Sequence, residues 1–203
     1  MESNKFLILY LLILTVLIEG CSVVTTKFKA TDLERLKEVN TIAILAGESG
    51  KTKKKDVEMV LEELNKATVE QGRFKVVPSE QVRNELGGLF VNVESPVPVH
   101  EGMHRQMFVG TFSPKWKDLD ASTAQALGRK LGVDAVCILW VPGLKGKREI
   151  IVAAQLFSTT DGGEIGHTSL SRKATCILFL CFSNAIKSAT KVIAEEMAKQ
   201  AKR

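Results

Sequence analysis

A regular run of hydrophobic and polar positions lies between Leu119 and Pro142 and predicts a helix followed by a buried strand. Asp120 can cap the helix, because its carboxylate accepts hydrogen bonds from the free amides of the first turn. Three apolar residues then recur at helical spacing and form one stripe: Ala124, Leu127 and Leu131. Gly132 suits the left-handed position that ends a helix. Val133–Val141 is apolar almost throughout, which predicts a strand covered on both faces in a layered helix-and-sheet domain.

The same pattern continues along the chain as alternating helices and strands. Helical spacing predicts a helix over Asp56–Val69 that ends at Gly72 and has an apolar stripe of Val57, Val60, Leu61, Leu64 and Thr68. It also predicts a short helix from Ser79 to Leu86 that ends at Gly87-Gly88, and a final helix capped by Ser183 or Asn184. The apolar face of that final helix comprises Ile186, Ala189, Ile193 and Met197. Further strands are predicted over Thr41–Ala46, Arg73–Val77, Glu149–Ser158 and Glu164–Arg172, the last as a polar edge strand after a hairpin turn at Thr159–Gly163. The predicted fold class is α/β (α+β), with a mixed sheet of four or five strands packed by three or four helices in a single domain.

The remaining segments set the expected domain layout. Residues 1–20 form a targeting segment, residues 21–40 a lead-in, and residues 41–203 the α/β domain. The lead-in contains the strand-prone run VVTTKFKA and a possible helix cap at Thr31 or Asp32. Residues 89–117 hold three of the five prolines and show no clear apolar period. They are therefore expected to form an insertion or an extended loop with short elements.

The first twenty residues have the organisation of a secretory signal peptide. Lys5 supplies a positive charge, and Phe6–Ile18 is uncharged and apolar, but shorter than the roughly 20 residues that a helix needs to cross a bilayer. The following residues, Leu17-Ile18-Glu19-Gly20-Cys21-Ser22, resemble the lipobox of bacterial lipoproteins. In that motif the cysteine becomes the lipidated first residue, so we expect Cys21 to carry a lipid anchor that includes palmitate. The alternative is a plain signal peptide followed by an ordinary Cys21 thiol.

The net charge of the chain does not identify a class of binding partner. The chain has a net charge of +5, and removal of residues 1–20 would leave 27 basic and 21 acidic residues. Such a mild excess fits nucleic acid, an anionic membrane surface and a polyanionic envelope polymer equally well. The basic residues are scattered rather than interleaved with aromatic residues, so nucleic-acid binding is not predicted.

The ordered motifs resemble a bacterial envelope domain shared by three groups of proteins. These groups are the curli secretion-channel lipoproteins, the N-terminal domain of the Tol-system propeller protein, and the outer-membrane lipoproteins that activate peptidoglycan synthases. The resemblance spans roughly Asn40 to Ser171. It rests on Gly72-Arg73-Phe74, Ala124, Leu127-Gly128, Leu131-Gly132, Asp134-Ala135-Val136 and Asp161-Gly163-Glu164.

This resemblance implies a non-enzymatic envelope domain that binds another envelope protein or associates with itself. No cofactor, nucleotide or nucleic acid is expected to bind. With the lipobox the resemblance implies the periplasmic face of the bacterial outer membrane; the inner membrane and the cell surface are the other placements that an anchor allows. The sequence lacks two long amphipathic hairpins, so a curli-type pore is not expected.

A loop with partial similarity to a phosphate-binding loop follows the first predicted strand of the domain. Gly50-Lys51-Thr52 matches the end of the G-x-x-x-x-G-K-[ST] pattern, but Leu45 stands where the first glycine is required. We therefore interpret this loop as a polar turn followed by solvated lysines, and nucleotide binding is not predicted.

A literal H-E-x-x-H motif spans His100-Glu101-Gly102-Met103-His104. On a helix, His100 and His104 would share one face and could bind zinc, with Glu101 as general base. Gly102 within the motif and two prolines just before it disfavour a helix, and no residue is marked as the third ligand among Glu149, Glu164 and His167. A zinc-dependent metallopeptidase is therefore the competing function, and polar loop histidines are the favoured interpretation. His167 is expected at the surface.

Three cysteines remain besides Cys21, and three thiols cannot all pair within one chain. Cys137 lies in the predicted buried strand and is expected to be a small core residue. Cys176 and Cys181 are too far apart for a bridge in a regular helix. Their segment, residues 176–182, is expected to be a buried lead-in to the last helix, with membrane contact or an oligomer contact as alternatives.

Overall fold

A computed structural model describes residues 23–25, 28–48, 52–94, 121–145, 149–173 and 180–203, whose strands form one mixed sheet. The strands are β1 (Val23–Thr25), β2 (Lys29–Ala30), β3 (Thr41–Glu48), β4 (Lys75–Val76), β5 (Phe90–Glu94), β6 (Ala135–Lys145), β7 (Glu149–Ser158) and β8 (Glu164–Lys173). Their order is β1-β8-β7-β6-β3-β4, with β2 also paired to β8 and β5 also paired to β3. The mixed α/β fold expected from the sequence is confirmed.

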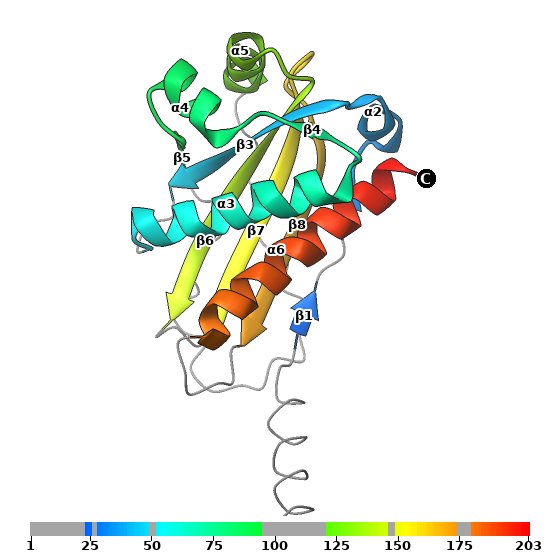
Figure 1. The fold of residues 1–203 in the computed structure, drawn as a ribbon. Coiled ribbons are helices and arrows are strands. Elements are labelled where there is room, and N and C mark those ends of the chain that lie inside the picture. Colours follow the sequence, from blue (N-terminus) through cyan, green and yellow to red (C-terminus); the bar gives the residue numbers. More distant parts are fainter. Residues whose placement is uncertain (1–22, 26–27, 49–51, 95–120, 146–148, 174–179) are drawn as a thin grey trace, which may run out of the picture.

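The sheet joins a parallel half to an antiparallel half. β3 runs parallel to β4, β5 and β6, whereas β6, β7 and β8 are antiparallel neighbours joined in sequence. The starts of β3, β6 and β8 therefore meet the end of β7 at one end of the sheet, which we call the Asp134 end. At the opposite end, which we call the Val23 end, β1 starts and β6 and β8 finish (Figure 1).

The two central strands are shielded on both faces. Successive residues of a strand point to opposite faces, yet every residue from Ala135 to Val141 in β6 and from Ile42 to Ala46 in β3 is buried. This confirms the prediction that the apolar run in β6 is a strand covered on both faces. The register pairs Ile42 with Ala135 and Ala46 with Leu139, so both strands contribute to one continuous core.

Two long helices, α3 (Lys54–Gln71) and α6 (Leu180–Ala201), lie side by side across one face of the sheet (Figure 1). The predicted stripe of α3 is buried, and the helix ends at Gly72 with φ 63°. All four residues predicted for the apolar face of α6 are buried: Ile186, Ala189, Ile193 and Met197. However, α6 begins before Ser183, so the prediction that Ser183 or Asn184 caps it is wrong.

The shorter helices lie toward the Asp134 end (Figure 1). Asp32 caps α2 (Leu33–Glu38) by accepting a hydrogen bond from the Arg35 amide at 3.1 Å. The predicted short helix is α4 (Ser79–Leu86), which ends at Gly87 with φ 76°. The helix predicted between Leu119 and Pro142 is α5 (Ala121–Leu131). It buries Ala124 and Leu131 and ends at Gly132 with φ 64°. Asp120, its expected cap, lies outside the described residues.

The sheet has more strands than the four or five expected, because short segments pair at its margins. β8 is not an edge strand, since β1 and β2 from the lead-in pair with its outer side. β5 belongs to the segment 89–117 that was expected as an insertion, yet it pairs with β3. The Leu89 carbonyl accepts a hydrogen bond from the Ala46 amide at 2.8 Å. Leu89–Glu94 is therefore part of the main sheet, and residues 95–117 lie outside the described part of the chain.

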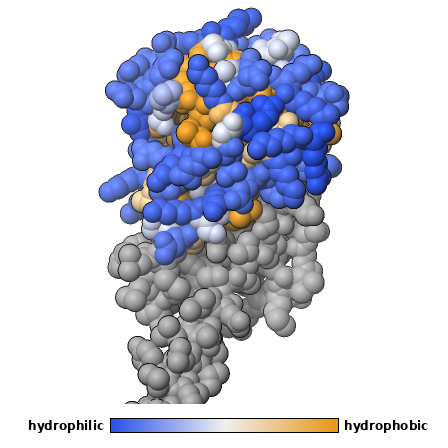
Figure 2. Space-filling view, turned by 45° about the vertical axis from the view of Figure 1, so that its right-hand side comes forward, coloured by the Kyte–Doolittle hydropathy of each residue, from blue (hydrophilic) through white to orange (hydrophobic). Residues whose placement is uncertain are grey.

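The surface of the described residues is mainly hydrophilic on the face shown in Figure 2. One apolar area, enclosed by hydrophilic residues, lies in the upper half of that view, which is the half nearer the Asp134 end. Within the part of the chain that the structure describes, no helix is long and apolar enough to cross a membrane.

Candidate functional site

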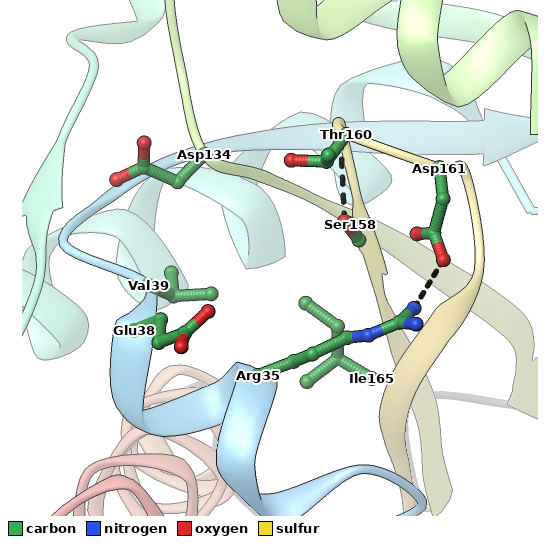
Figure 3. A pocket seen from close by; sticks show the side chains of 8 residues that line it. All are labelled: Arg35, Glu38, Val39, Asp134, Ser158, Thr160, Asp161 and Ile165. Atoms are coloured by element: carbon green, nitrogen blue, oxygen red, sulfur yellow. Dashed lines mark hydrogen bonds and ion pairs between the residues drawn. The ribbon is translucent and has the colours of Figure 1, made fainter.

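A pocket opens at the Asp134 end of the sheet, between α2, the start of β6 and the turn that joins β7 to β8 (Figure 3). It has a volume of about 440 Å³ and is lined by Arg35, Glu38, Val39, Asp134, Ser158, Thr160, Asp161 and Ile165. Val39 and Ile165 are buried and give the wall its apolar part. The pocket thus combines apolar and charged surface in one hollow, a combination typical of binding sites.

Asp134 fastens the start of β6 to the start of β3. Its Oδ2 accepts hydrogen bonds from the Asn40 amide at 3.0 Å, from the Thr41 amide at 2.8 Å and from the Thr41 hydroxyl at 2.9 Å. In return, the Asp134 amide donates to the Thr41 carbonyl at 3.1 Å. One carboxylate therefore closes the parallel pair of β3 and β6 at this end.

The hydrogen bonds to Asp134 also determine its charge. Partial burial raises the pKa of Asp134, but the hydrogen bonds from Thr41 and Asn40 stabilise the carboxylate and outweigh burial, so the pKa lies below its ordinary value. The side chain is consequently ionised at neutral pH. A carboxylate held by three donors serves to position the backbone rather than to take up a proton as a general base.

The turn between β7 and β8 supplies a second carboxylate to the pocket. Asp161 Oδ1 accepts a hydrogen bond from the Gly163 amide at 3.1 Å, and Asp161 Oδ2 forms an ion pair with Arg35 (Figure 3). The Gly163 amide lowers the pKa of Asp161, and together with Ser158 and Arg35 it outweighs the effect of burial. Because Arg35 Nε also contacts Asp32 at 2.9 Å, two carboxylates share one guanidinium.

Two glycines let α5 pack tightly against this turn. A Cβ atom at Gly128 would lie 2.1 Å from the Thr159 Cβ, and one at Gly162 would lie 2.4 Å from the Ala121 carbonyl oxygen. Thr159 uses its hydroxyl to donate to the Val133 carbonyl at 2.6 Å. The glycine of the Ala124-x-x-Leu127-Gly128 motif is therefore explained by the close approach of α5 to the turn between β7 and β8.

The ionisable groups of the pocket leave it negatively charged. The lining of the pocket has three carboxylates, those of Glu38, Asp134 and Asp161, and one guanidinium, that of Arg35. Figure 3 shows Arg35 paired with Asp161, whereas the Asp134 carboxylate points away from Arg35. Ser158 stabilises the turn between β7 and β8, since its hydroxyl accepts a hydrogen bond from the Thr160 amide at 3.2 Å. The group that this arrangement favours electrostatically is a positively charged one, such as the side chain of lysine or arginine on a partner protein.

Arg73 of the predicted Gly-Arg-Phe motif joins the ends of two helices outside the pocket. Its guanidinium donates to the Lys37 carbonyl at 2.7 Å, to the Val39 carbonyl at 2.9 Å and, through Nε, to the Ala201 carbonyl at 3.4 Å. These carbonyls belong to the C-terminal ends of α2 and α6, where backbone acceptors lack helical partners. The motif arginine is therefore a structural clamp.

Glu164, the last residue of the motif, forms a partly buried polar cluster. Its carboxylate accepts a hydrogen bond from Gln155 Nε2 at 2.6 Å and contacts His167 Nδ1 at 2.5 Å. Burial raises the pKa of Glu164, but His167 and Gln155 outweigh burial and hold the pKa below its ordinary value. The expectation that His167 is a surface residue is wrong, since its side chain is only 20% exposed.

The structure leaves most of the predicted site residues untested. Cys21, Lys51, His100, Glu101 and His104 lie outside the described residues. Among the described residues, no group of three or more His, Cys, Asp or Glu side chains is arranged to hold a metal ion. Cys137 is buried as expected, and burial raises the pKa of its thiol to about 12.

The sequence interpretation missed Arg35 and the pocket around it. Asp134, Asp161 and Gly163 were noted as motif residues, but their hydrogen bonds join positions far apart in the chain. Arg35 and Asp161 are 126 positions apart, so local periodicity carries no signal of their contact. The Asp32 cap was the one available hint, because it fixes the start of the helix that presents Arg35.

Comparisons with known proteins give structural matches only; no family model and no curated protein matches the chain. The chain is similar to the PelC dodecamer from Paraburkholderia phytofirmans, with 10% identity over 85% of this chain and 96% of that chain and a TM-score of 0.44. Lipoprotein GNA1162 from Neisseria meningitidis matches with 16% identity, 66% and 79% coverage and a TM-score of 0.42. The LpoB C-terminal domain from Salmonella enterica matches with 14% identity, 68% and 90% coverage and a TM-score of 0.41.

At identities of 10% to 16% and TM-scores of 0.41 to 0.44 the likeness concerns the architecture alone. The function is therefore argued from the residues of this chain.

Proposed function

We propose that this chain is a lipid-anchored, periplasm-facing envelope protein that acts as a non-catalytic protein-binding or assembly module. The observation that carries the proposal is the placement of the pocket relative to Cys21. Cys21 lies two positions before Val23, the first residue of β1. Val23 pairs with Arg172 at the far end of β8, whereas the pocket residue Ile165 lies near its start.

This register separates the anchor from the pocket by the length of a strand. Seven residue steps divide Ile165 from Arg172, and each step of a strand advances about 3.3 Å, so the separation is roughly 23 Å. A lipid on Cys21 would therefore hold the Val23 end at the membrane and present the pocket at the opposite end, away from the bilayer. Such a pocket can be reached by another envelope protein.

The Asp134 end of the molecule has surface features that suit a protein partner. Its carboxylates favour a basic side chain, and the apolar area at this end of the molecule (Figure 2) is enclosed by hydrophilic residues. An apolar patch with a polar rim is typical of surfaces that bind proteins. The partner is therefore expected to bring a lysine or arginine next to apolar side chains.

Anchoring is tested first by the change Cys21→Ser. We expect this change to abolish lipidation and either to release soluble protein or to leave an uncleaved precursor, with the mass of the N-terminal peptide and detergent partitioning as the measurements. Unchanged partitioning of the variant would contradict the lipid anchor.

Partner binding is tested by photo-crosslinking in intact cells. A photoreactive amino acid in place of Glu38, at the pocket, should give one adduct of discrete mass, whereas the same replacement of the exposed Lys66 on α3 should give none. The Glu38 adduct should also change when Arg35→Gln makes the pocket more negative. Equal adducts from both positions would argue against the pocket as the binding site.

The competing function is a lipid-anchored zinc metallopeptidase that uses His100, Glu101 and His104. It is tested by metal analysis of the purified mature protein and of a His104→Ala variant. Stoichiometric zinc that is lost in the variant would support the peptidase. Substoichiometric zinc that the variant does not change would exclude it.

A further inference from the structure

The guanidinium of Arg35 contacts two carboxylates that come from different parts of the chain. Arg35 Nε lies 2.9 Å from Asp32 Oδ2, and Arg35 Nη1 forms an ion pair with Asp161 Oδ2 (Figure 3). Asp32 is the cap of α2, whereas Asp161 belongs to the turn between β7 and β8. Carboxylate contacts to a planar guanidinium are a common way in which proteins recognise arginine. The pocket therefore contains a guanidinium site, and a residue of the chain itself occupies it.

Gly163 leaves room for a guanidinium at this site. A Cβ atom at Gly163 would lie 3.1 Å from Arg35 Nη1 and 3.4 Å from both carboxylate oxygens of Asp161. The first distance is shorter than a favourable van der Waals contact, so a larger residue would crowd the ion pair. Gly163 is not among the described glycines with positive φ, so its backbone conformation does not require glycine. The missing side chain therefore serves the space around the guanidinium.

The backbone around the site does not depend on the Arg35 side chain. Asp32 caps α2 by accepting a hydrogen bond from the Arg35 backbone amide at 3.1 Å, and Asp161 holds its turn by accepting one from the Gly163 amide at 3.1 Å. Both carboxylates use Oδ1 for the backbone and Oδ2 for the guanidinium. The Arg35 side chain is 44% exposed, and exposed ion pairs contribute little to stability. Another guanidinium can therefore replace that of Arg35 without loosening the helix or the turn.

The rest of the pocket suits a cationic side chain with an apolar stem. Its lining adds the carboxylates of Glu38 and Asp134 and the apolar wall of Val39 and Ile165. An arginine can lay its methylene groups on an apolar surface and keep its charged head among polar groups. Arg35 is the one basic residue among those that line the pocket. A second guanidinium would therefore compete with Arg35 alone.

We propose that Arg35 holds the place of an arginine of the partner protein, whose guanidinium displaces Arg35 and binds Asp32 and Asp161. This inference rests on the proposed function, because it names the residue by which a partner enters the pocket. Arginine is favoured over lysine, since a planar guanidinium presents donors to two carboxylates at once, whereas an ammonium is a point charge. In the free protein Arg35 lowers the affinity for the partner, because only molecules with a vacated site can bind.

The test titrates a small probe, N-acetyl-arginine amide, into the purified full-length mature protein in detergent micelles. The NMR signal of the Gly163 amide reports binding, because this amide donates to Asp161. N-acetyl-lysine amide should bind less tightly than the arginine probe. Arg35→Gln should lower the dissociation constant of the arginine probe about two- to fivefold. A fivefold change corresponds to about 1 kcal/mol, the upper value for an exposed ion pair.

Three further variants separate competition by Arg35 from a general change in charge. Arg35→Lys keeps the charge but loses the planar guanidinium, so it should give part of the gain of Arg35→Gln. Lys37→Gln is the matched control, because it removes one positive charge from the same helix, where Lys37 pairs with Glu34 at 3.0 Å outside the pocket lining. It should leave the dissociation constant unchanged. Asp161→Asn keeps an acceptor for the Gly163 amide and should abolish the gain when it is combined with Arg35→Gln.

Two results of the titration would overturn the inference. The first is an Arg35→Gln variant that binds the arginine probe no more tightly than the unchanged protein does. The second is an equal gain in Lys37→Gln, which would show that net charge alone sets the affinity.

Photo-crosslinking from the Glu38 position separates this inference from the proposed function. An adduct in cells without the expected probe results would overturn the inference alone. Probe binding without any adduct would contradict the protein partner and, with it, the inference. Where both experiments succeed, the cross-linked peptide of the partner should contain an arginine, and Arg35→Gln should raise the yield of the adduct. A partner peptide without arginine would also overturn the inference.

Discussion

The two ends of the β-sheet use their polar residues in different ways. At the Asp134 end, Asp134, Thr159 and Asp161 bind backbone groups, and Arg73 clamps two helix ends nearby. At the Val23 end, the strand register brings three basic residues and Glu149 into the last two rows of β6, β7 and β8. The difference teaches that long-range hydrogen bonds from side chains to the backbone hold the Asp134 end together, whereas the polar residues at the Val23 end are brought together by strand register.

This comparison also separates stability from function. Changes at the Asp134 end should lower the free energy of unfolding before they affect binding, because the side chains there hold strands and turns in place. The predictions below test how much individual residues contribute to stability, in order of decreasing expected effect.

The largest effect is expected from Leu131→Ala at the joint between α5 and β6. Leu131 is 6% exposed, and removal of a buried leucine side chain costs about 2–5 kcal/mol. Gly132→Val should be harmful too, since φ is 64° there and a β-branched residue tolerates positive φ poorly. Chemical denaturation of both variants is the measurement.

A His104→Ala variant is the comparison, and its free energy of unfolding should fall far less than that of Leu131→Ala. An equal loss would mean that residues 89–117 contribute to the core or bind a metal.

The second effect concerns Asp134→Asn, which removes the charge but keeps the shape. We expect a loss of about 1–2 kcal/mol at neutral pH, because the charge-assisted hydrogen bonds from the Asn40 and Thr41 amides weaken. The pKa of Asp134 is lowered in the folded protein, so its contribution is complete above the ordinary value of about 3.9 and is lost as the pH falls through the lower folded value.

Urea unfolding of the Asp134→Asn variant and the unchanged protein at several pH values measures this contribution. The difference between them should be constant from pH 7 to about pH 5 and should shrink as the pH falls below about 4. A difference that is the same at pH 3 and pH 7 would show that the charge of Asp134 does not stabilise the fold.

A smaller effect is expected from Arg35→Gln in the pocket. The Arg35 side chain is 44% exposed, and exposed ion pairs contribute about 0–1 kcal/mol. Cross-linking from the Glu38 position should nevertheless change, because the variant makes the pocket more negative. A loss of stability as large as that of Leu131→Ala would mean that the pocket is part of the core rather than a surface for a partner.

The smallest effect on stability is expected from Lys51→Ala, whose side chain we interpret as solvated. Denaturation midpoints should agree within about 0.5 kcal/mol. Micromolar, magnesium-dependent nucleotide binding that disappears in this variant would overturn the interpretation of the loop as a polar turn.

The local parts of the fold could be predicted from the sequence. Glycines with positive φ follow three helices at the expected residues, Gly72, Gly87 and Gly132, because a left-handed helix end is decided by the residues next to it. The strand Glu149–Ser158 also has its predicted bounds. These elements depend on periodicity and turn chemistry within a few positions of the chain.

The long-range parts could not be predicted. The lead-in was expected to favour strand, but its pairing with β8 depends on the exposed edge of a hairpin more than a hundred positions later. The pocket has the same origin, since α2 and the β7–β8 turn approach each other only in the folded chain. Motif residues such as Asp134 could be noted in the sequence, but their hydrogen-bond partners could not.

The short strand β1 would give the proposed lipid anchor at Cys21 an extensible connection to the domain. Any pull on Cys21 reaches the domain first through Val23–Thr25, whose backbone pairs with Leu170–Arg172 along only three residues. This strand should yield before the body of the sheet, because few hydrogen bonds share the load. Its release would free residues 23–27 and lengthen the tether by roughly 17 Å, so the domain could follow a moving partner without leaving the membrane. Single-molecule pulling from residue 21 should show a short extension at low force before the main unfolding event; a single unfolding event without it would rule out this extensible tether.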